Sequence, residues 1–429
     1  MRKPASILMV TAASMLASVV YAQDTNRGTH LAGSQRVLHQ PASSVSRTAQ
    51  SASPTRQVNY VEPIHVDSYN QIDCEPTCTP TAAWISAEWL YWSTKGVDFP
   101  ALATSSPSSA DQTVAGVLPT SITQFGNEEF HDDTRSGGRF SVGGWLDANH
   151  TTSVEVSYLE LNDTSESFNA SANSFPALAR PFIDTTTETE NARLINFDGL
   201  IEGELAIRST SEFRTYEALL RHSFIYANGS RTGFIIGYRG ANLDDMVRID
   251  ESTTALTDVV AGTSFVLFDE FDTENEFHGL TLGYEYIGPT IQNGSLEFFG
   301  KVALGATSSR ATVNGGTNVT TATGDASASS AGFLAQGTNI GTFKEDEFDT
   351  ISEVGIRMRF HSQYDLDFFV GYSFLYWGEV ARAGSQIDRG INVSQIPPGT
   401  LVGEERPRPP IERESFWAQG LNVGLSYAF

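Results

Sequence analysis

The chain ends with the sequence Gln419-Gly420-Leu421-Asn422-Val423-Gly424-Leu425-Ser426-Tyr427-Ala428-Phe429, in which apolar residues alternate with small or polar ones. Successive side chains of a β-strand point to opposite faces, so one face here would be apolar and partly aromatic. A strand of a soluble sheet can show the same alternation. In an exported, acidic chain, a last strand that ends on Phe429 favours the closing strand of an outer-membrane β-barrel, with Phe429 as its assembly signal.

The N-terminal residues predict export. Arg2 and Lys3 precede an apolar or small stretch at 7–20, and Val20-Tyr21-Ala22 is typical of a cleavage site. The stretch is shorter than the roughly 20 residues that a membrane-spanning helix needs. We therefore expect a signal peptide over 1–22, and membrane insertion of the remaining chain would have to use β-strands.

Composition narrows the class of protein. The chain has 429 residues, a net charge of −24, 37 Gly and 11% aromatic residues but only 5 Met, which favours β-rich structure over helical bundles. An acidic chain without a basic stripe argues against nucleic-acid binding. The sequence contains no Gly-x-Ser-x-Gly, His-Glu-x-x-His or phosphate-loop motif, so we expect neither an enzyme nor a cofactor. Acidic pairs such as Asp244-Asp245 lack EF-hand spacing, and calcium binding by them stays open.

Residues 23–81 are rich in Ser, Thr, Gln, Ala and Pro and show little periodicity. Such a segment buries too little apolar surface to offset its ordering entropy, so we expect a disordered periplasmic extension. A solvated tail is the favoured interpretation of its mildly basic part, and contact with an anionic cell-wall polymer is the alternative. Cys74 and Cys78 predict a short disulfide, as in exported proteins, with free thiols or a metal site as alternatives.

From residue 82 onward, stretches of period-two or β-rich sequence recur. We mark about ten of them as strands. They are 84–92, 139–147, 152–161, 213–226, 231–243, 276–287, 295–306, 351–361, 365–376 and 416–429. The connections between these stretches alternate between long and short.

The short connections are 148–150, 227–230, 288–294 and 362–364, and the long ones are 93–138, 162–212, 244–275, 307–350 and 377–415. Short periplasmic turns and long outer loops are typical of an up-and-down transmembrane barrel, whereas a β-sandwich does not sort its loops in this way. We therefore predict an all-β, antiparallel barrel over 82–429 with about ten strands, or about twelve if 193–207 and 263–268 add strands. Most of the negative charge falls in the long connections, above all in 244–275. We interpret these acids as solvated loop charges, and the alternative is an acidic rim that biases small solutes toward cations.

The less apolar face of each strand should line the lumen, because a charge on the lipid face costs about 2–4 kcal/mol near the midplane. On stretch 351–361, for example, Ile356 would face lipid and Arg357 the lumen. The predicted lumen-lining residues are Glu88, Glu155, Glu217, Arg221, Glu297, Lys301, Glu353, Arg357, Arg359 and Asp367. These residues form either a salt-bridged plug or the wall of a wet path. A barrel of about ten strands lies near the size that its own side chains fill.

Aromatic side chains gather at the ends of three stretches. They are Trp84, Trp89, Tyr91, Trp92, Tyr376, Trp377, Phe416 and Trp417. Bilayer interfaces favour such rings, and packing in a β-core is the alternative for each of them.

Several ordered segments point to a known family. The most specific are Gly371-Tyr372-Ser373-Phe374-Leu375-Tyr376-Trp377, the segment 380–388 and Phe416-Trp417-Ala418-Gln419-Gly420-Leu421, with further matches at 87–92, 138–147, 237–239, 271–279 and 301–305. Over 84–429 the chain resembles the planctomycete family of beta-barrel porins, the seventh barrel family so designated. Ser352-Glu353 departs from the Pro-Glu expected there. The resemblance implies a barrel in the outer membrane, and it supplies no catalytic residue and no substrate.

Two functions follow as expectations. The first is porin-like passage of small hydrophilic solutes through a narrow, cation-biased pore. The alternative is a closed structural or adhesive barrel that acts through its long acidic loops. Outer-membrane lipid and the barrel-assembly machinery are the expected partners. Asn275 and the segment Arg382 to Asp388 lie at strand–loop junctions, and we expect them to hold loops by hydrogen bonds.

Overall fold

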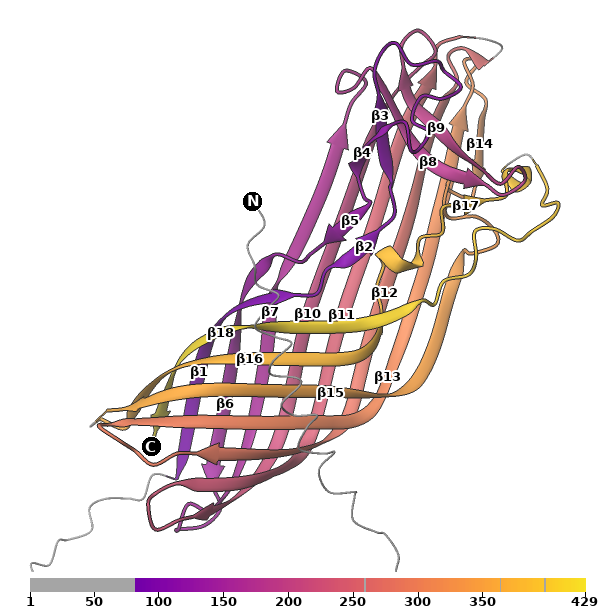
Figure 1. Ribbon diagram of the computed structural model, residues 1–429. Helices are drawn as coiled ribbons and strands as arrows, with labels where there is room; N and C mark the ends of the chain where they lie inside the picture. Colours follow the sequence, from indigo (N-terminus) through magenta and orange to yellow (C-terminus); the bar gives the residue numbers. More distant parts are fainter. Residues whose placement is uncertain (1–81, 258–259, 363, 397–398) are drawn as a thin grey trace, which may run out of the picture. The chain divides into compact units, whose positions relative to one another are not determined.

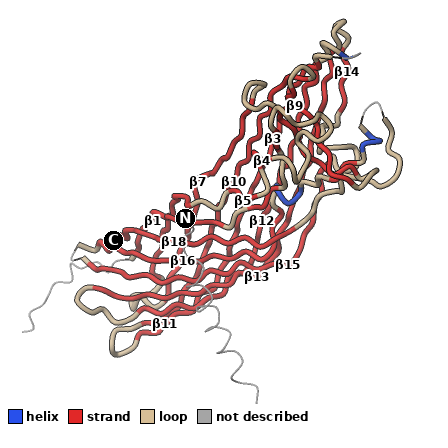
Figure 2. Tube along the Cα trace, turned by 45° about the horizontal axis from the view of Figure 1, so that its top comes forward, coloured by secondary structure: helices blue, strands red, loops and turns tan. Residues whose placement is uncertain are grey.

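The computed structural model describes residues 82–429 apart from 258–259, 363 and 397–398. The predicted signal peptide, the extension 23–81 and the pair Cys74 and Cys78 lie outside these residues. Strand dominates the described chain, and the two 3₁₀ turns η3 (Gly384–Gln386) and η4 (Val393–Gln395) are short, as Figure 2 shows in blue. No helix in the described ranges is long and apolar enough to cross a bilayer.

Ten antiparallel strands form a closed barrel, which confirms the predicted fold. The barrel strands are β1 (Ala83–Thr94), β6 (Thr134–Trp145), β7 (Thr152–Ala170), β10 (Ile201–Ile225), β11 (Arg231–Ala255), β12 (Ser264–Ile287), β13 (Gly294–Thr320), β15 (Gly341–His361), β16 (Leu366–Ala381) and β18 (Arg413–Ala428). Each strand pairs with the next one along the chain, and β18 pairs with β1 to close the ring. The last strand therefore closes the ring, as predicted. The carbonyl oxygen of Phe429 accepts hydrogen bonds from the backbone N–H of Ala82 and Ala83 at 2.9 and 3.0 Å.

The barrel strands are much longer on one side of the ring than the sequence predicted. β10 and β11 have 25 residues each and β13 has 27, whereas β1 and β6 have 12. The extra length lies at the end away from the short turns, so parts of the predicted loops 162–212, 244–275 and 307–350 are strand (Figure 1). We call this part of the barrel the outer extension. The alternative of about twelve barrel strands is wrong, because 263–268 falls largely within β12 and Arg193 belongs to a strand outside the ring.

The remaining strands are short and come from the long connections. They are β2 (Val97–Phe99), β3 (Ala103–Ser106), β4 (Ile122–Phe125), β5 (Glu128–Phe130), β8 (Ala177–Asp184), β9 (Thr189–Phe197), β14 (Ala326–Ser329) and β17 (Gly390–Ile391). β8 pairs with β3, β9 and β17, so connections that are far apart in sequence join into one layer at the outer extension.

Along each barrel strand, side chains alternate between the outside and the lumen. On β15, Val354, Ile356 and Met358 are exposed on the outside, whereas Glu353 is fully buried inside. The same alternation gives β18 its outward Leu421, Leu425 and Tyr427. These exposed apolar faces form a band around the ring that suits contact with lipid tails.

The aromatic residues divide between the two alternatives that the sequence left open. Trp89, Tyr91 and Tyr376 are exposed on the outside, as residues of a bilayer interface would be. Trp92, Trp377 and Phe416 are fully buried inside the barrel. Strand periodicity explains the division, since neighbouring residues of one strand must face opposite ways.

The lipid-facing band makes a testable prediction for β15. Ile356→Lys places a charge in the middle of the band and should lower the free energy of unfolding by about 2–4 kcal/mol. Phe348→Lys changes the same face of the same strand, but Phe348 lies beyond the band between Asp346 and Thr350 and should tolerate the charge. Denaturant unfolding in lipid vesicles measures both variants. Equal losses of stability would contradict the assigned position of the bilayer.

Candidate functional site: the lumen of the barrel

A network of ion pairs lies in the half of the lumen nearer to the short turns. All ten residues predicted to line the lumen belong to ion pairs there. We call this set, with its partners Arg139, Arg239, Glu285 and His361, the luminal network. Its charges come from most strands of the ring, so it connects walls that face each other.

Glu353 on β15 is the centre of the luminal network. Its carboxylate is 2.8 Å from Nη2 of Arg139 and 3.0 Å from Nζ of Lys301, and it also pairs with Arg239. Lys301 and Arg239 in turn contact Glu217 at 2.6 and 2.9 Å. Three cations and two carboxylates therefore meet in one buried cluster. Because a buried charge is stable only when it is paired, this cluster fixes the positions of five strands relative to one another.

A second branch of the network runs toward the short turns. Arg357 bridges Glu88 at 2.8 Å and Glu297 at 3.8 Å. Arg359 then links Glu297 at 2.6 Å with Asp367 at 3.5 Å. In a separate group, Arg221 pairs with Glu155 and Glu285 at 2.7 and 3.3 Å.

Sequence reasoning assigned no role to Arg139 or Arg239, although both are central to the network. The signal for Arg139 is its place next to the outward-facing Phe140, and Arg239 follows the outward-facing Tyr238. Strict alternation along those two strands would have predicted that both residues face the lumen.

A cavity of about 430 Å³ lies within this half of the barrel. Its lining includes the residues of the luminal network other than Glu353 and Arg239, several serine residues, and Trp84 and Trp145 near the turns. In outer-membrane barrels the short turns face the periplasm. The cavity is therefore a polar chamber at the periplasmic end.

An apolar layer crosses the lumen directly beyond the luminal network. Every barrel strand except β6 contributes to it. We call it the inner apolar layer, and its members are Leu90, Trp92, Leu159, Leu161, Phe213, Ala241, Leu243, Phe277, Ala303, Ile351, Leu375, Trp377, Val380, Phe416 and Ala418. None of these side chains is more than 2% exposed. An open aqueous path at this level would wet some of them, so the lumen is closed here.

The two tryptophans of the inner apolar layer are fixed by hydrogen bonds. Nε1 of Trp92 donates to Asn422 Oδ1 at 2.7 Å, and Nε1 of Trp377 donates to Thr307 Oγ1 at 2.9 Å. A buried indole N–H needs such a partner, and having one holds each ring in a single orientation.

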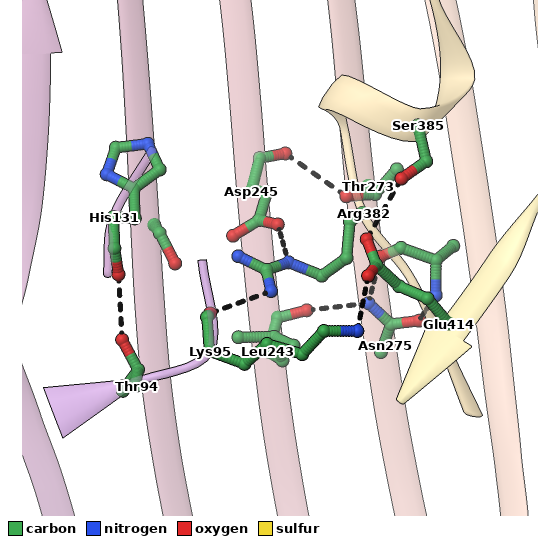
Figure 3. Close-up of polar contacts among 12 residues, drawn as sticks. Thr94, Lys95, His131, Leu243, Asp245, Thr273, Asn275, Arg382, Ser385 and Glu414 are labelled. Atoms are coloured by element: carbon green, nitrogen blue, oxygen red, sulfur yellow. Dashed lines mark hydrogen bonds and ion pairs between the residues drawn. The ribbon is translucent and has the colours of Figure 1, made fainter. Parts of the chain in front are cut away.

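Asn275 holds the chain where β16 leaves the barrel wall (Figure 3). Its amide donates to the carbonyl oxygen of Ala381 and accepts from the N–H of Ala381, both at 2.7 Å. The next residue, Arg382, pairs with Asp245 across the lumen. The predicted role of Asn275 at this junction is confirmed.

The rest of segment 382–388 is held in the same manner. Asp388 accepts hydrogen bonds from Gly390 N–H at 2.8 Å and from Arg406 and the N–H of Arg408 at 2.9 Å each. Gln386 donates to the carbonyl oxygens of Arg382 and Glu412 at 3.0 and 2.7 Å. These contacts confirm that the segment fastens loops to one another.

Asp269 holds another connection, at residues 333–335, inside the lumen. One oxygen of its carboxylate accepts the N–H groups of Phe333, Leu334 and Ala335 at 2.8–2.9 Å. The other oxygen pairs with Arg180 at 2.5 Å. The prediction that the acids of 244–275 are loop charges is therefore wrong for Asp245, Glu251 and Asp269, which are buried in the lumen.

Apolar side chains from these segments pack into the outer extension as a second buried cluster. It joins strand residues such as Val247 and Ile249 with Val97, Phe99 and Phe333 from the connections. We call it the outer apolar cluster. The lumen thus holds polar and apolar layers in alternation.

Burial shifts the ionisation of two groups in the outer extension. It raises the pKa of Asp244 to about 6, a shift that Arg214 opposes and that Glu274 and Glu212 reinforce. It lowers the pKa of His131 to about 4, so that the imidazole is neutral at pH 7. Within the described ranges, no three of His, Cys, Asp and Glu are grouped so that they could hold a metal ion.

Comparison with known proteins identifies a family. The family model described as Putative beta barrel porin-7 matches residues 84–429. No curated protein matches the chain. The planctomycete origin implied by the resemblance stays a prediction.

Among solved structures, the chain is similar to the outer membrane protease OmpT from Escherichia coli, with 9% identity, a TM-score of 0.38 and coverage of 82% of this chain and 98% of that one. It is also similar to a Pseudomonas aeruginosa FadL homologue, with 7% identity, a TM-score of 0.22 and coverage of 80% and 89%. At these TM-scores neither likeness carries an argument about function.

The buried cluster around Glu353 gives a prediction for stability. Glu353→Gln keeps the shape of the side chain but leaves Arg139, Arg239 and Lys301 with too little negative charge, and it should lower the free energy of unfolding by about 3–5 kcal/mol. Glu276→Gln is the matched control, because Glu276 is exposed and its one ion pair among the described residues is with the exposed His278 at 3.0 Å. Denaturant unfolding would show the difference, and similar stability of the two variants would contradict the central role of Glu353.

Asp244 gives a prediction for pH dependence. Its pKa is about 6 in the folded protein and near 3.8 when unfolded, so this group destabilises the barrel above pH 6. The penalty disappears as the pH falls from 6 toward 4. Asp244→Asn should therefore be the more stable protein at pH 7, and its advantage should shrink at pH 5.

The control for this pH experiment is Asp250→Asn, since Asp250 pairs with Arg248 at 3.0 Å on the same outer face. Because this substitution removes an attractive ion pair, it should not make the protein more stable than the wild type at pH 7. An advantage of Asp244→Asn that grew on acidification would have the wrong sign and would refute the raised pKa.

Proposed function

Because the chain belongs to the Putative beta barrel porin-7 family and is an outer-membrane β-barrel, we propose that it acts as a closed barrel that presents its outer extension at the cell surface. The observation that carries this proposal is the inner apolar layer. Its side chains come from all barrel strands except β6, and each is at most 2% exposed.

The segments beyond the inner apolar layer support the same function. Asn275, Asp245 and Asp269 each hold an inward connection by direct hydrogen bonds or ion pairs. A flexible lid would not need so many buried polar contacts, because each one adds to the free energy of opening. The barrel is therefore built to keep these connections in place.

The outer extension supplies the proposed working surface. Its outward face carries Glu212, Asp244 and Glu274 side by side on paired strands. Like charges at directly opposed positions weaken a sheet, so an outward face that carries three of them favours a role in contact with other molecules. A partner for this surface would carry positive charge. The proposal assigns the barrel no enzymatic activity.

A second candidate function is porin-like passage of small hydrophilic solutes with a bias toward cations. The family description and the polar chamber of about 430 Å³ at the periplasmic end favour it. Passage would require the inner apolar layer and the fastened segments to move apart. In either case we propose that a cleaved signal peptide over 1–22 exports the chain and that assembly uses the terminal strand with Phe429.

Conductance across a planar lipid bilayer tests the two functions against each other. A heat-dependent gel shift first establishes that the purified barrel is folded, and a porin of known conductance serves as the positive control. The closed barrel should insert without discrete current steps.

Discrete steps from the wild-type barrel, with a cation preference that weakens at high salt, would overturn the closed barrel and establish a pore. In that case Arg357→Ala should change the ion preference, because Arg357 lines the chamber. Lys344→Ala is the control on the outer face of β15 and should leave the preference unchanged.

A further inference from the structure

Four ionisable side chains are enclosed between the two apolar layers of the lumen. They are His131, Arg135, Asp245 and Arg382, and none is more than 5% exposed. Along β11, Asp245 lies between Leu243 of the inner apolar layer and Val247 of the outer apolar cluster. Figure 3 shows His131, Asp245 and Arg382 in this layer.

The charges of this group do not balance. Arg382 pairs with Asp245. Among the described residues, Arg135 donates only to neutral oxygens, which are the Thr94 hydroxyl at 3.0 Å, the Ser211 carbonyl at 3.2 Å, and the His131 carbonyl and Ser211 hydroxyl at 3.4 Å each. Burial lowers the pKa of Arg135 to about 10, which leaves it charged at pH 7, while His131 is neutral. One carboxylate thus faces two guanidinium groups.

Neighbouring charged groups do not pair with Arg135. Asp349, which is buried on β15 two residues beyond Ile351, accepts hydrogen bonds from Thr307 Oγ1 at 2.8 Å and from the N–H of Glu379 at 3.1 Å. Lys95 is paired with Glu414 at 2.6 Å, so this pair is neutral. The side chain of Glu166 approaches His131 but is 36% exposed, and Asp163 is exposed. Both of these carboxylates are solvated, which weakens their effect on a buried charge.

The same group contains polar atoms without partners. Among the described residues, Nε of Arg135, Nη2 of Arg382 and Oδ1 of Asp245 are buried and make no hydrogen bond. An unpaired guanidinium in an apolar environment is costly, and native proteins usually satisfy such donors. A bound ion of opposite charge would satisfy both the donors and the charge.

We propose that this layer is a binding site for a small monovalent anion of the chloride type, held by the Arg135 guanidinium with Nη2 of Arg382 as a second donor. The negative charge of Asp245 disfavours anions that are bulky or doubly charged. Water can accept the same hydrogen bonds but does not supply the missing charge. The inference does not depend on whether the barrel conducts.

Crystals of the full-length protein grown in sodium bromide test the site directly. An anomalous peak within hydrogen-bonding distance of Arg135 Nε is expected. The absence of a peak there, with bromide seen elsewhere on the surface, would overturn the proposal.

Unfolding in chloride and in gluconate at equal ionic strength gives an independent measurement. At a chloride concentration about ten times the dissociation constant, the unfolding constant should fall by about an order of magnitude. Arg135→Met should remove this response. Arg214→Met is the control, because Arg214 is an exposed arginine of β10 and the variant should keep the response.

An equal chloride response of wild type and Arg135→Met would overturn the site. If Arg135→Met does not fold, Arg135→Lys keeps the charge and should retain a weaker response, and the bromide peak decides independently of any variant.

Discussion

The lumen of a ten-stranded barrel has to be filled by the side chains that its own strands turn inward, because strand periodicity sends every second residue there. Charged residues can fill it only if they are paired. Glu353 meets this condition with Arg139, Arg239 and Lys301, which belong to β6, β11 and β13. One carboxylate on β15 therefore ties together strands that are several positions apart in the ring. The arrangement of the strands around the periplasmic half of the lumen depends on this pairing.

The inner apolar layer imposes a second constraint on the same lumen. Aromatic rings such as Trp92 and Trp377 need partners for their N–H groups. Asn422 supplies one from the adjacent strand, and Thr307 supplies the other from a strand two positions away in the ring. Beyond this layer, the carboxylate of Asp269 accepts three successive backbone N–H groups and so replaces the water that an exposed loop would bind. The long connections are consequently part of the core of the outer extension.

Strand periodicity in the sequence was sufficient to predict the barrel, the pairing of the last strand with the first and the inward position of residues such as Glu353. It was insufficient to predict where the strands end, because the charged residues between 244 and 275 indicated a loop. In fact Asp245 and Glu251 continue the inward face that includes Val247 and Ile249. Their partners Arg382, Arg180 and Arg193 come from distant connections. Local sequence carries no information about which buried acid meets which arginine, so the layers of the lumen could not be predicted.

The order of the layers in the lumen determines which segments would have to move for the barrel to open. Moving a single side chain such as Trp92 would leave the outer apolar cluster in place, and moving an inward segment would separate Arg382 from Asp245 or Asp269 from its N–H donors. Either separation leaves a buried charge without its partner. The free-energy cost of that is far larger than the cost of breaking a contact in water. A conducting state would therefore need several segments to leave the lumen together and to become solvated as they leave. That requirement is why the geometry favours a closed barrel over a narrow pore that is gated by one residue.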